Sequence, residues 1–281
     1  MAQDRFSVSS FRDAKKKGRP ITMLTAYDYT TARLLDAAGI DSLLVGDSLG
    51  MTMLGYPDTL RVTMDEMIHH TRAVARAAEH AMVIGDMPFM SYHVSVEDAV
   101  RNAGRFIQQG RAQAIKLEGG RQVIDKVKAI CRAQIPVLGH LGLTPQSVNV
   151  MGGFKVQGKD IEAARQIMDD ALMLQDAGVF GIILECVPAA LAARITETLE
   201  IPTVGIGAGN GCDGQVLVIQ DLLGLYKQLR PKFVKTYADL GSAVEKAVKD
   251  YIEQVRTRAF PTEKHSFAMA PEVMEKLLSS K

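Results

Sequence analysis

The amino-acid sequence predicts a single-domain α/β protein, a (β/α)8 TIM barrel with an N-terminal helical extension. Short apolar runs alternate with segments of helical periodicity, which is typical of a parallel sheet with right-handed crossovers. There are eight such runs, and the length of 281 residues suits a barrel with extensions. No GxGxxG motif follows the first run, which disfavours an open dinucleotide-binding sheet.

The apolar runs predict strands that are buried on both faces, because most of them carry leucine or β-branched residues at consecutive positions. The expected strands cover residues 21–26, 42–46, 82–85, 113–117, 136–139, 181–184, 202–206 and 216–219. One link is irregular, since only nine residues separate Ile206 from Val216. That is too short for a full crossover helix, so we expect a short helical turn or a different last pairing there.

Helix boundaries are visible between these strands. Thr63 and Glu66 form a capping box before a helix expected near 64–80, and Pro188 suits the first turn of another helix. The other expected helices cover 96–109, 121–133, about 160–177 and 189–199, with one near 9–16 before the barrel and an amphipathic one near 242–257 after it. The domain boundaries that we expect are an N-terminal extension over 1–20, a catalytic barrel over 21–267 and a C-terminal tail over 268–281.

Composition and charge disfavour several classes of partner and location. Lys plus Arg number 33 against 32 for Asp plus Glu, so no basic face for nucleic acid is expected. No apolar stretch is long enough to span a bilayer, and residues 1–20 lack the apolar segment of a signal peptide. The three cysteines, Cys131, Cys186 and Cys212, show no CxxC spacing, which disfavours a disulfide framework. We therefore expect a cytoplasmic protein with neither a nucleic-acid nor a membrane partner.

Carboxylates follow several otherwise apolar strands. Four of them lie at expected strand ends: Asp47, Asp86, Glu118 and Glu185. In a barrel these ends converge on the face that carries active sites. Burying several negative charges together is costly unless a cation neutralises them, and carboxylate oxygens suit Mg²⁺. Lys116 precedes Glu118 by two residues, so on an extended strand both side chains point to the same face.

A single aspartate after a strand is more often a helix N-cap than a ligand. We interpret Asp28 and Asp221 as caps, because each precedes a helical segment. Asp47 is followed by a long loop, Asp86 by Met-Pro and Glu118 by Gly-Gly. None of these three has the context of a simple cap.

His140 also lies at an expected strand end. It is either a neutral imidazole satisfied by the backbone or a proton carrier that contacts the substrate, and the spacing leaves both open. A glycine-rich segment over 205–209 either binds phosphate through its amides or lets the backbone approach a ligand closely.

Two long segments, 47–62 and 140–159, show little helical or strand pattern, and loops of this length in a compact domain are usually functional. Both start at the expected active face. The glycines at 152, 153 and 158 would allow the second segment to move as a lid.

Taken together, these segments resemble the ketopantoate hydroxymethyltransferase family. The most specific matching stretches are GDSLGM (46–51), GHLGLTPQSVN (139–149) and LECVP (184–188). Other matching stretches in family order are TAYD (25–28), DMPFMSY (86–92), KLEGG (116–120), GGFKVQG (152–158), IPTVGIGAG (201–209), DGQVLV (213–218), PKFVKTY (231–237) and FPTEKHSF (260–267). The resemblance runs over nearly all of residues 21–267.

The resemblance implies a (β/α)8 barrel that transfers a hydroxymethyl group from 5,10-methylenetetrahydrofolate to α-ketoisovalerate, forming ketopantoate for pantothenate biosynthesis. It implies one Mg²⁺ per subunit near Asp47, Asp86 and Glu118. It also implies that the 2-oxo acid contacts Asp47, Ser48, Asp86 and Lys116. Glu185 would be the catalytic base. The family forms homo-oligomers, commonly decamers of this subunit.

This chemistry agrees with the residues at the strand ends. A 2-oxo acid can chelate Mg²⁺, which stabilises an enolate, and a nearby base must take the C3 proton. An alternative is a related Mg²⁺-dependent 2-oxo acid lyase or mutase of the isocitrate lyase and phosphoenolpyruvate mutase type, which needs no folate. A barrel that only binds a metabolite is a further alternative, but binding alone has no use for Glu185 as a base.

Overall fold

The computed structural model describes residues 5–226 and 231–280, and it confirms a closed barrel of eight parallel strands in chain order. The strands are β1 (Ile21–Thr25), β2 (Ser42–Val45), β3 (Met82–Asp86), β4 (Ala114–Glu118), β5 (Val137–Gly142), β6 (Gly181–Glu185), β7 (Thr203–Ile206) and β8 (Gly214–Leu217). The ring closes where β8 pairs with β1, with Met23 opposite Val216. The strand bounds differ from the expected ones by at most three residues, with the largest difference at the end of β5.

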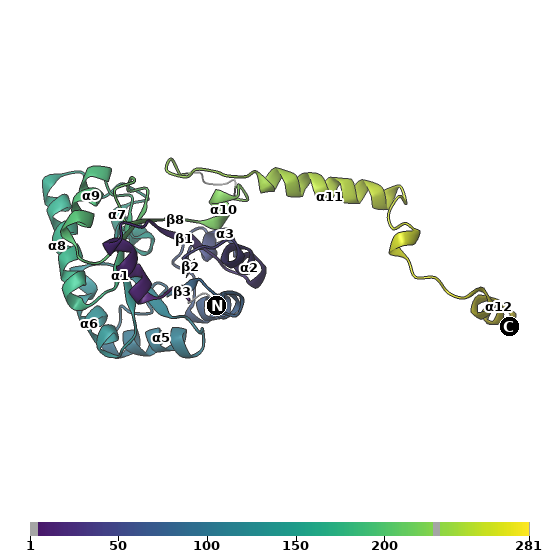
Figure 1. Cartoon of the computed structure of the whole chain (residues 1–281), viewed down its shortest axis with the longest axis horizontal. Helices are drawn as coiled ribbons and strands as arrows, with labels where there is room; N and C mark the ends of the chain where they lie inside the picture. The colour runs from purple at the N-terminus through teal and green to yellow at the C-terminus, as the bar shows by residue number, and fades with distance from the viewer. Residues whose placement is uncertain (1–4, 227–230, 281) are drawn as a thin grey trace.

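Helices surround the barrel, as Figure 1 shows. Those that follow the strands are α2 (Tyr29–Ala37), α4 (Met64–Ala77), α5 (Val96–Gln108), α6 (Ile124–Arg132), α8 (Ile161–Ala177) and α9 (Ala189–Thr198). The capping box is confirmed, because the Thr63 hydroxyl accepts from the Glu66 N–H and the Glu66 carboxylate accepts from the Thr63 N–H. Short helices lie in the loops: α3 (Leu49–Thr52), α7 (Val148–Met151), α10 (Ile219–Leu222) and the 3-10 turns η1 (Arg121–Val123) and η2 (Pro145–Ser147).

The irregular link between β7 and β8 differs from both expectations. Residues 207–213 form no helical turn, and the last pairing stays parallel, with Val204 opposite Gly214. Gly207 has a φ of +62°, and a Cβ there would lie 2.8 Å from Phe233. The glycines therefore allow close approach of the chain to its own neighbours.

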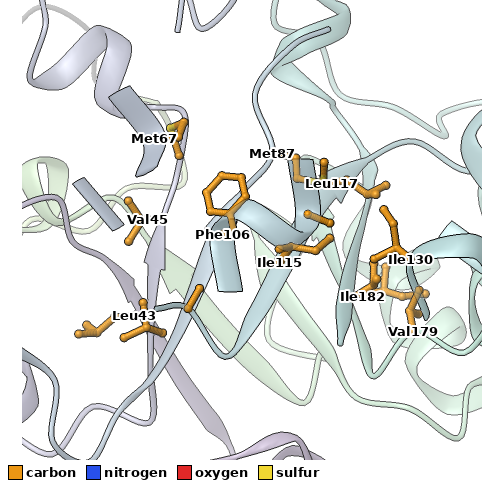
Figure 2. Close-up of a cluster of buried hydrophobic side chains, with 14 of the residues drawn as sticks. Leu43, Val45, Met67, Met87, Phe106, Ile115, Leu117, Ile130, Val179 and Ile182 are labelled. Atoms are coloured by element: carbon orange, nitrogen blue, oxygen red, sulfur yellow. The ribbon is translucent and has the colours of Figure 1, made fainter. Parts of the chain in front are cut away.

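Two layers of apolar side chains form the core. One layer lies between strands and helices, where Figure 2 shows Phe106 of α5 near Leu43 and Ile115. Gly85 makes room for this ring, because a Cβ there would lie 2.3 Å from Cδ1 of Phe106. The other layer fills the barrel with side chains from alternate strand positions: Met23, Leu44, Ile84, Ala114, Leu138, Val204 and Val216.

The N-terminal helix α1 (Val8–Lys16) closes one end of the barrel. Its Phe11 is buried in the inner layer, with its ring centroid 5.1 Å from that of Phe180, the residue just before β6. Lys15 of α1 forms an ion pair of 2.9 Å with Asp213, just before β8. The amino ends of the strands are thus covered, and the carboxyl ends remain for a binding site.

The C-terminal segment leaves the barrel, as Figure 1 shows. It contains α11 (Leu240–Arg256), the 3-10 turn η3 (Glu263–His265) and α12 (Pro271–Ser279), none of which has a buried residue. The domain boundaries at residues 20 and 267 stay a prediction. No helix in the described ranges is long and apolar enough to cross a membrane. The three cysteines, all of them described, are free.

Candidate active site

The inner layer of the barrel turns polar at the carboxyl ends of β3, β4 and β5. Side chains alternate across a strand, so residues two or four positions beyond an inner apolar residue also point inward. The inward polar residues at these ends are Asp86, Lys116, Glu118 and His140, and all are buried. Asp86 lies opposite Lys116 and Glu118 opposite His140 in the strand register. The expected convergence of these groups is confirmed.

Lys116 is held between two carboxylates. Its Nζ donates to Asp86 Oδ2 at 2.9 Å and to Glu118 Oε1 at 3.0 Å. Burial lowers the pKa of Lys116, but the attraction of Asp86 and Glu118 outweighs it and raises this pKa well above its ordinary value. The lysine therefore stays protonated and fixed at the bottom of the site.

Asp47 joins the group from the loop after β2. Its backbone N–H donates to Asp86 Oδ2 at 3.1 Å, and its side chain is buried. Burial raises the pKa of both Asp47 and Asp86, and repulsion between the two carboxylates raises that of Asp47 further. For Glu118, burial is opposed by Lys116 and His140, which together lower its pKa to about 2. Nearby positive charge therefore does not offset the effect of burial on Asp47 and Asp86, whereas at Glu118 it does.

The donor set at this site fits a hard divalent cation in part. Asp86 Oδ1 is buried and has no hydrogen-bond partner in the described part of the chain. Four carboxylates face one lysine and one histidine, which leaves two negative charges when both are protonated. Among residues 5–226 and 231–280, however, no three acidic, cysteine or histidine side chains already converge at metal-binding distance. Asp47 and Asp86 fit as ligands as they stand, whereas both oxygens of Glu118 are engaged by protein donors.

Two buried residues that the sequence did not single out hold these acids in place. Gln146 donates through Nε2 to Asp47 Oδ2 at 2.8 Å, and its backbone N–H donates to Glu118 Oε2 at 3.0 Å. The Tyr92 hydroxyl donates to Gln146 Oε1 at 2.7 Å and accepts from the Glu118 N–H at 3.2 Å. Both residues lie in matched stretches, DMPFMSY and GHLGLTPQSVN. Their role in holding the acids is visible only in the structure, from their burial and these hydrogen bonds.

His140 bridges the buried acids and Glu185. Its Nδ1 lies 3.4 Å from Glu118 Oε1 and its Nε2 lies 3.3 Å from Glu185 Oε2. Neither contact has the alignment of a hydrogen bond. Burial and Lys116 lower the pKa of His140, but the two carboxylates outweigh them and raise it to about 9. The sequence left open whether the backbone satisfies the His140 imidazole. In the structure its ring nitrogens lie near carboxylates and form no hydrogen bond with the backbone of the described residues.

Glu185 differs from the other acids in its exposure. It ends β6, and 18% of its side chain is exposed to the cavity, against 1% for that of Glu118. The cavity has a volume of about 470 Å³ and is lined by all of the predicted site residues. Ser48 lies on the rim, where its hydroxyl is 2.8 Å from that of Tyr27. A carboxylate that lies beside His140 and is open to the cavity can be reached by a proton of a bound molecule.

The long segments after β2 and β5 both contribute to this cavity. Met51 and Thr52 line it from α3, and Phe154, Lys155 and Val156 line its mouth. Both segments contain short helices, which their sequence pattern did not reveal. Helices of four residues leave too little periodicity to detect. Movement of residues 140–159 as a lid stays a prediction.

The two aspartates that we interpreted as helix caps have different positions. Asp28 is a cap, since its side chain accepts from the Thr31 N–H at 2.9 Å at the start of α2. The interpretation of Asp221 was wrong, because α10 begins at Ile219, and Asp221 lies inside it and lines the cavity. Its helix starts two residues earlier than its sequence suggests, because the Thr25 hydroxyl accepts the Ile219 N–H at 3.0 Å.

A closed parallel barrel with buried acids and a lysine below a cavity at its carboxyl ends defines a (β/α)8-barrel enzyme. The family model described as ketopantoate hydroxymethyltransferase matches residues 5–263. The chain belongs to this family and is thus an enzyme of the transferase class. The match also includes α1, beyond the stretches that carried the sequence resemblance.

Known relatives agree with this assignment. A protein of Acetivibrio thermocellus named 3-methyl-2-oxobutanoate hydroxymethyltransferase is 59% identical over 98% of this chain and 97% of its own length. One of the same name from Syntrophus aciditrophicus is 60% identical over 94% of this chain and 97% of its own length. The similarity therefore extends over nearly the whole chain.

Solved structures at low identity share the fold. Phosphonopyruvate hydrolase, solved with oxalate and Mg²⁺, has a TM-score of 0.61 at 13% identity, over 92% of each chain. A 2,3-dimethylmalate lyase of the phosphoenolpyruvate mutase/isocitrate lyase superfamily has a TM-score of 0.59 at 17% identity, over 96% of this chain and 94% of its own. At these identities the likeness shows the barrel architecture alone.

Proposed function

We propose that the protein transfers a hydroxymethyl group from 5,10-methylenetetrahydrofolate to α-ketoisovalerate (3-methyl-2-oxobutanoate) and so forms ketopantoate. The observation that carries this proposal is the site itself: a protonated lysine fixed among buried acids, beside a single more exposed carboxylate, in a family that is named for this product. This arrangement can bind a small anionic oxo acid and take a proton from it.

The metal of this proposal is Mg²⁺, held by Asp47 and Asp86 with Glu118 as the third acid of the group. Two observations support it: one Asp86 oxygen has no hydrogen-bond partner among the described residues, and burial together with repulsion from neighbouring carboxylates raises the pKa of both aspartates, an effect that a bound cation would oppose. When bound, Mg²⁺ would withdraw electrons from the ketone and so stabilise negative charge on its oxygen. Ser48 and Lys116, which line the same cavity, would contact the 2-oxo acid beside it.

The proton chemistry is assigned to Glu185. Its carboxylate takes the C3 proton, the C–H electrons pass toward the ketone oxygen, and an enolate forms. The enolate C3 then bonds to the methylene carbon of the folate as one of the two C–N bonds of that carbon breaks. Water displaces the second nitrogen and supplies the hydroxyl oxygen, and tetrahydrofolate leaves with the proton from C3 on one nitrogen and a proton from water on the other. His140, protonated because of its raised pKa, orients Glu185 and stores a proton nearby. We propose His140 as this proton carrier.

The proposal extends to assembly and location. We propose that the chain forms a homo-oligomer, a decamer in line with the family resemblance, in the cytoplasm. The C-terminal helices support an oligomer, because α11 has no buried residue and exposes the apolar side chains of Val244, Val248 and Val255. We propose that a second copy of the chain covers these exposed side chains, because the segment that carries them extends away from its own barrel. Light scattering at several protein concentrations would measure the assembly.

The proposed function is tested by product formation. Purified enzyme should form ketopantoate from α-ketoisovalerate only when both Mg²⁺ and 5,10-methylenetetrahydrofolate are present. Cleavage or rearrangement of a 2-oxo acid without folate would instead indicate the lyase or mutase alternative. No turnover with all components would contradict the proposed function.

A further inference from the structure

The cavity has two chemically different sides. The acids, Lys116 and His140 all come from the ends of β2 to β6. The other side comes from β7, β8 and described residues between 218 and 226 and between 231 and 233. Its lining is mainly apolar and includes Ile206, Val216, Leu217, Val218, Pro231 and Phe233. A five-carbon oxo acid held by the polar side leaves this apolar side for a second, larger molecule, since about 470 Å³ is in the range of pockets for drug-sized ligands.

Asp221 is the one carboxylate that lines this apolar side among the described residues. Its carboxylate oxygens form no hydrogen bond or ion pair in the described part of the chain, and burial alone raises its pKa to about 6. A half-buried acid without a partner costs stability, so it needs an explanation.

Local structure does not supply that explanation. Asp221 lies in the first turn of α10, but its side chain does not cap the helix, and the Ile219 N–H is already satisfied by Thr25. The favourable effect of a helix start on an acid would lower its pKa, whereas the pKa of Asp221 is raised. Its carboxylate is thus open to donors that arrive with a ligand.

We propose that Asp221 binds the pterin ring of the folate, accepting hydrogen bonds from the ring N3–H and the 2-amino group. These are two adjacent donors on one edge of a flat ring, and a carboxylate can accept such a pair with both oxygens. The apolar residues that line the same part of the cavity suit the faces of the ring. This inference rests on the proposed function and names the site of its second substrate.

The placement also explains how the two substrates meet. The pterin on the β8 side would bring its methylene carbon toward the polar side, where Glu185 of β6 faces the oxo acid. Asp221 contributes no proton to the reaction. Its role is recognition, so its loss should affect folate binding and leave enolisation intact.

The test is the variant Asp221→Asn, which keeps the shape but replaces one acceptor with a donor. The KM for 5,10-methylenetetrahydrofolate should rise roughly 10- to 100-fold, the range expected for lost hydrogen bonds to a charged group. The KM for α-ketoisovalerate, and its folate-free C3 hydrogen exchange in heavy water, should stay within about twofold of wild type. The matched control is Glu162→Gln, which removes an exposed acid from the first turn of α8, away from the cavity, and should change neither KM.

A second probe tests the contact directly. Tetrahydrofolate without its 2-amino group should bind more weakly than tetrahydrofolate to wild type, and the two should bind about equally to Asp221→Asn. An unchanged folate KM in Asp221→Asn, with folate-dependent turnover in wild type, would overturn this inference alone. Loss of C3 exchange together with folate binding would also overturn it, because it would indicate a structural role. Absence of folate-dependent turnover in wild type would overturn the proposed function and this inference with it.

Discussion

Replacing Tyr92 by phenylalanine should destabilise the protein far more than the loss of one hydroxyl group suggests. The Tyr92 hydroxyl is buried and serves Gln146 Oε1 and the Glu118 N–H at the same time. Without it, both partners lose a hydrogen bond inside the barrel. An unsatisfied buried polar group costs about 1–3 kcal/mol, so Tyr92→Phe should lower the free energy of unfolding by about 2–6 kcal/mol.

The assay is urea unfolding at pH 7 and one fixed protein concentration, because an oligomer would make the apparent stability depend on concentration. The matched control is Tyr56→Phe. The Tyr56 hydroxyl donates to Glu66 Oε1 at 2.7 Å, but this pair is partly exposed, so water can replace the lost bond. The control should lose less than about 1 kcal/mol. Equal losses in the two variants would refute the claim that Tyr92 supports a closed polar network.

Further outcomes follow from the same structure. Chelation should abolish activity and Mg²⁺ should restore it, while Asp86→Asn should weaken Mg²⁺-dependent binding of α-ketoisovalerate by calorimetry; full activity without metal would contradict this assignment. Substrate with Mg²⁺ should slow amide hydrogen exchange in residues 140–159, whose Phe154 and Val156 line the cavity mouth; identical exchange with and without ligands would argue against a lid. Asp36 accepts from the backbone N–H groups of residues 79, 80 and 81, and although its burial raises its pKa, these bonds lower it overall. A lowered folded-state pKa means that this stabilisation is present above the unfolded pKa of about 3.9 and is lost as the pH falls through the folded value. Asp36→Asn should therefore cost about 1.5–3 kcal/mol at pH 7, and the difference from wild type in urea unfolding should narrow below pH 4; a difference that stays constant with pH would show that the charge is irrelevant.

The barrel was predictable because its strands are buried on both faces and therefore appear as continuous apolar runs. That Lys116 and Glu118 lie on the same face of their strand was also predictable, because side chains alternate along a strand with a period of two residues. Five consecutive buried residues in β3 and β4 leave no other position for these charges than the interior.

The supporting residues could not be predicted in this way. Gln146 lies 99 residues from Asp47 and Tyr92 lies 26 residues from Glu118, and contacts of this separation depend on how loops return to the barrel. We misinterpreted Asp221 as a helix cap because its helix begins earlier, at Ile219, whose N–H donates to the hydroxyl of Thr25 on the distant strand β1. Local patterns carry no information on such distant partners.

The packing of α1 is a third case. Its periodicity predicted a helix near residues 9–16, but not that Phe11 would enter the barrel beside Phe180. The covered end agrees with the position of the cavity at the carboxyl ends of the strands. Phe11, from the segment that we expected to precede the barrel, is packed in the inner layer of the core.

The claim at the centre of this account is that Glu185 removes the C3 proton of the oxo acid. Glu185→Gln keeps the shape of the side chain and its place beside His140, but it cannot accept the proton as a carboxylate does. Nuclear magnetic resonance can follow the loss of the C3 hydrogen signal of α-ketoisovalerate in heavy water with enzyme and Mg²⁺, without folate. Wild type should exchange this hydrogen, and Glu185→Gln should exchange it about 10²–10⁴ times more slowly while still binding the oxo acid. Exchange at the wild-type rate in a variant that binds the oxo acid would show that Glu185 is not the base.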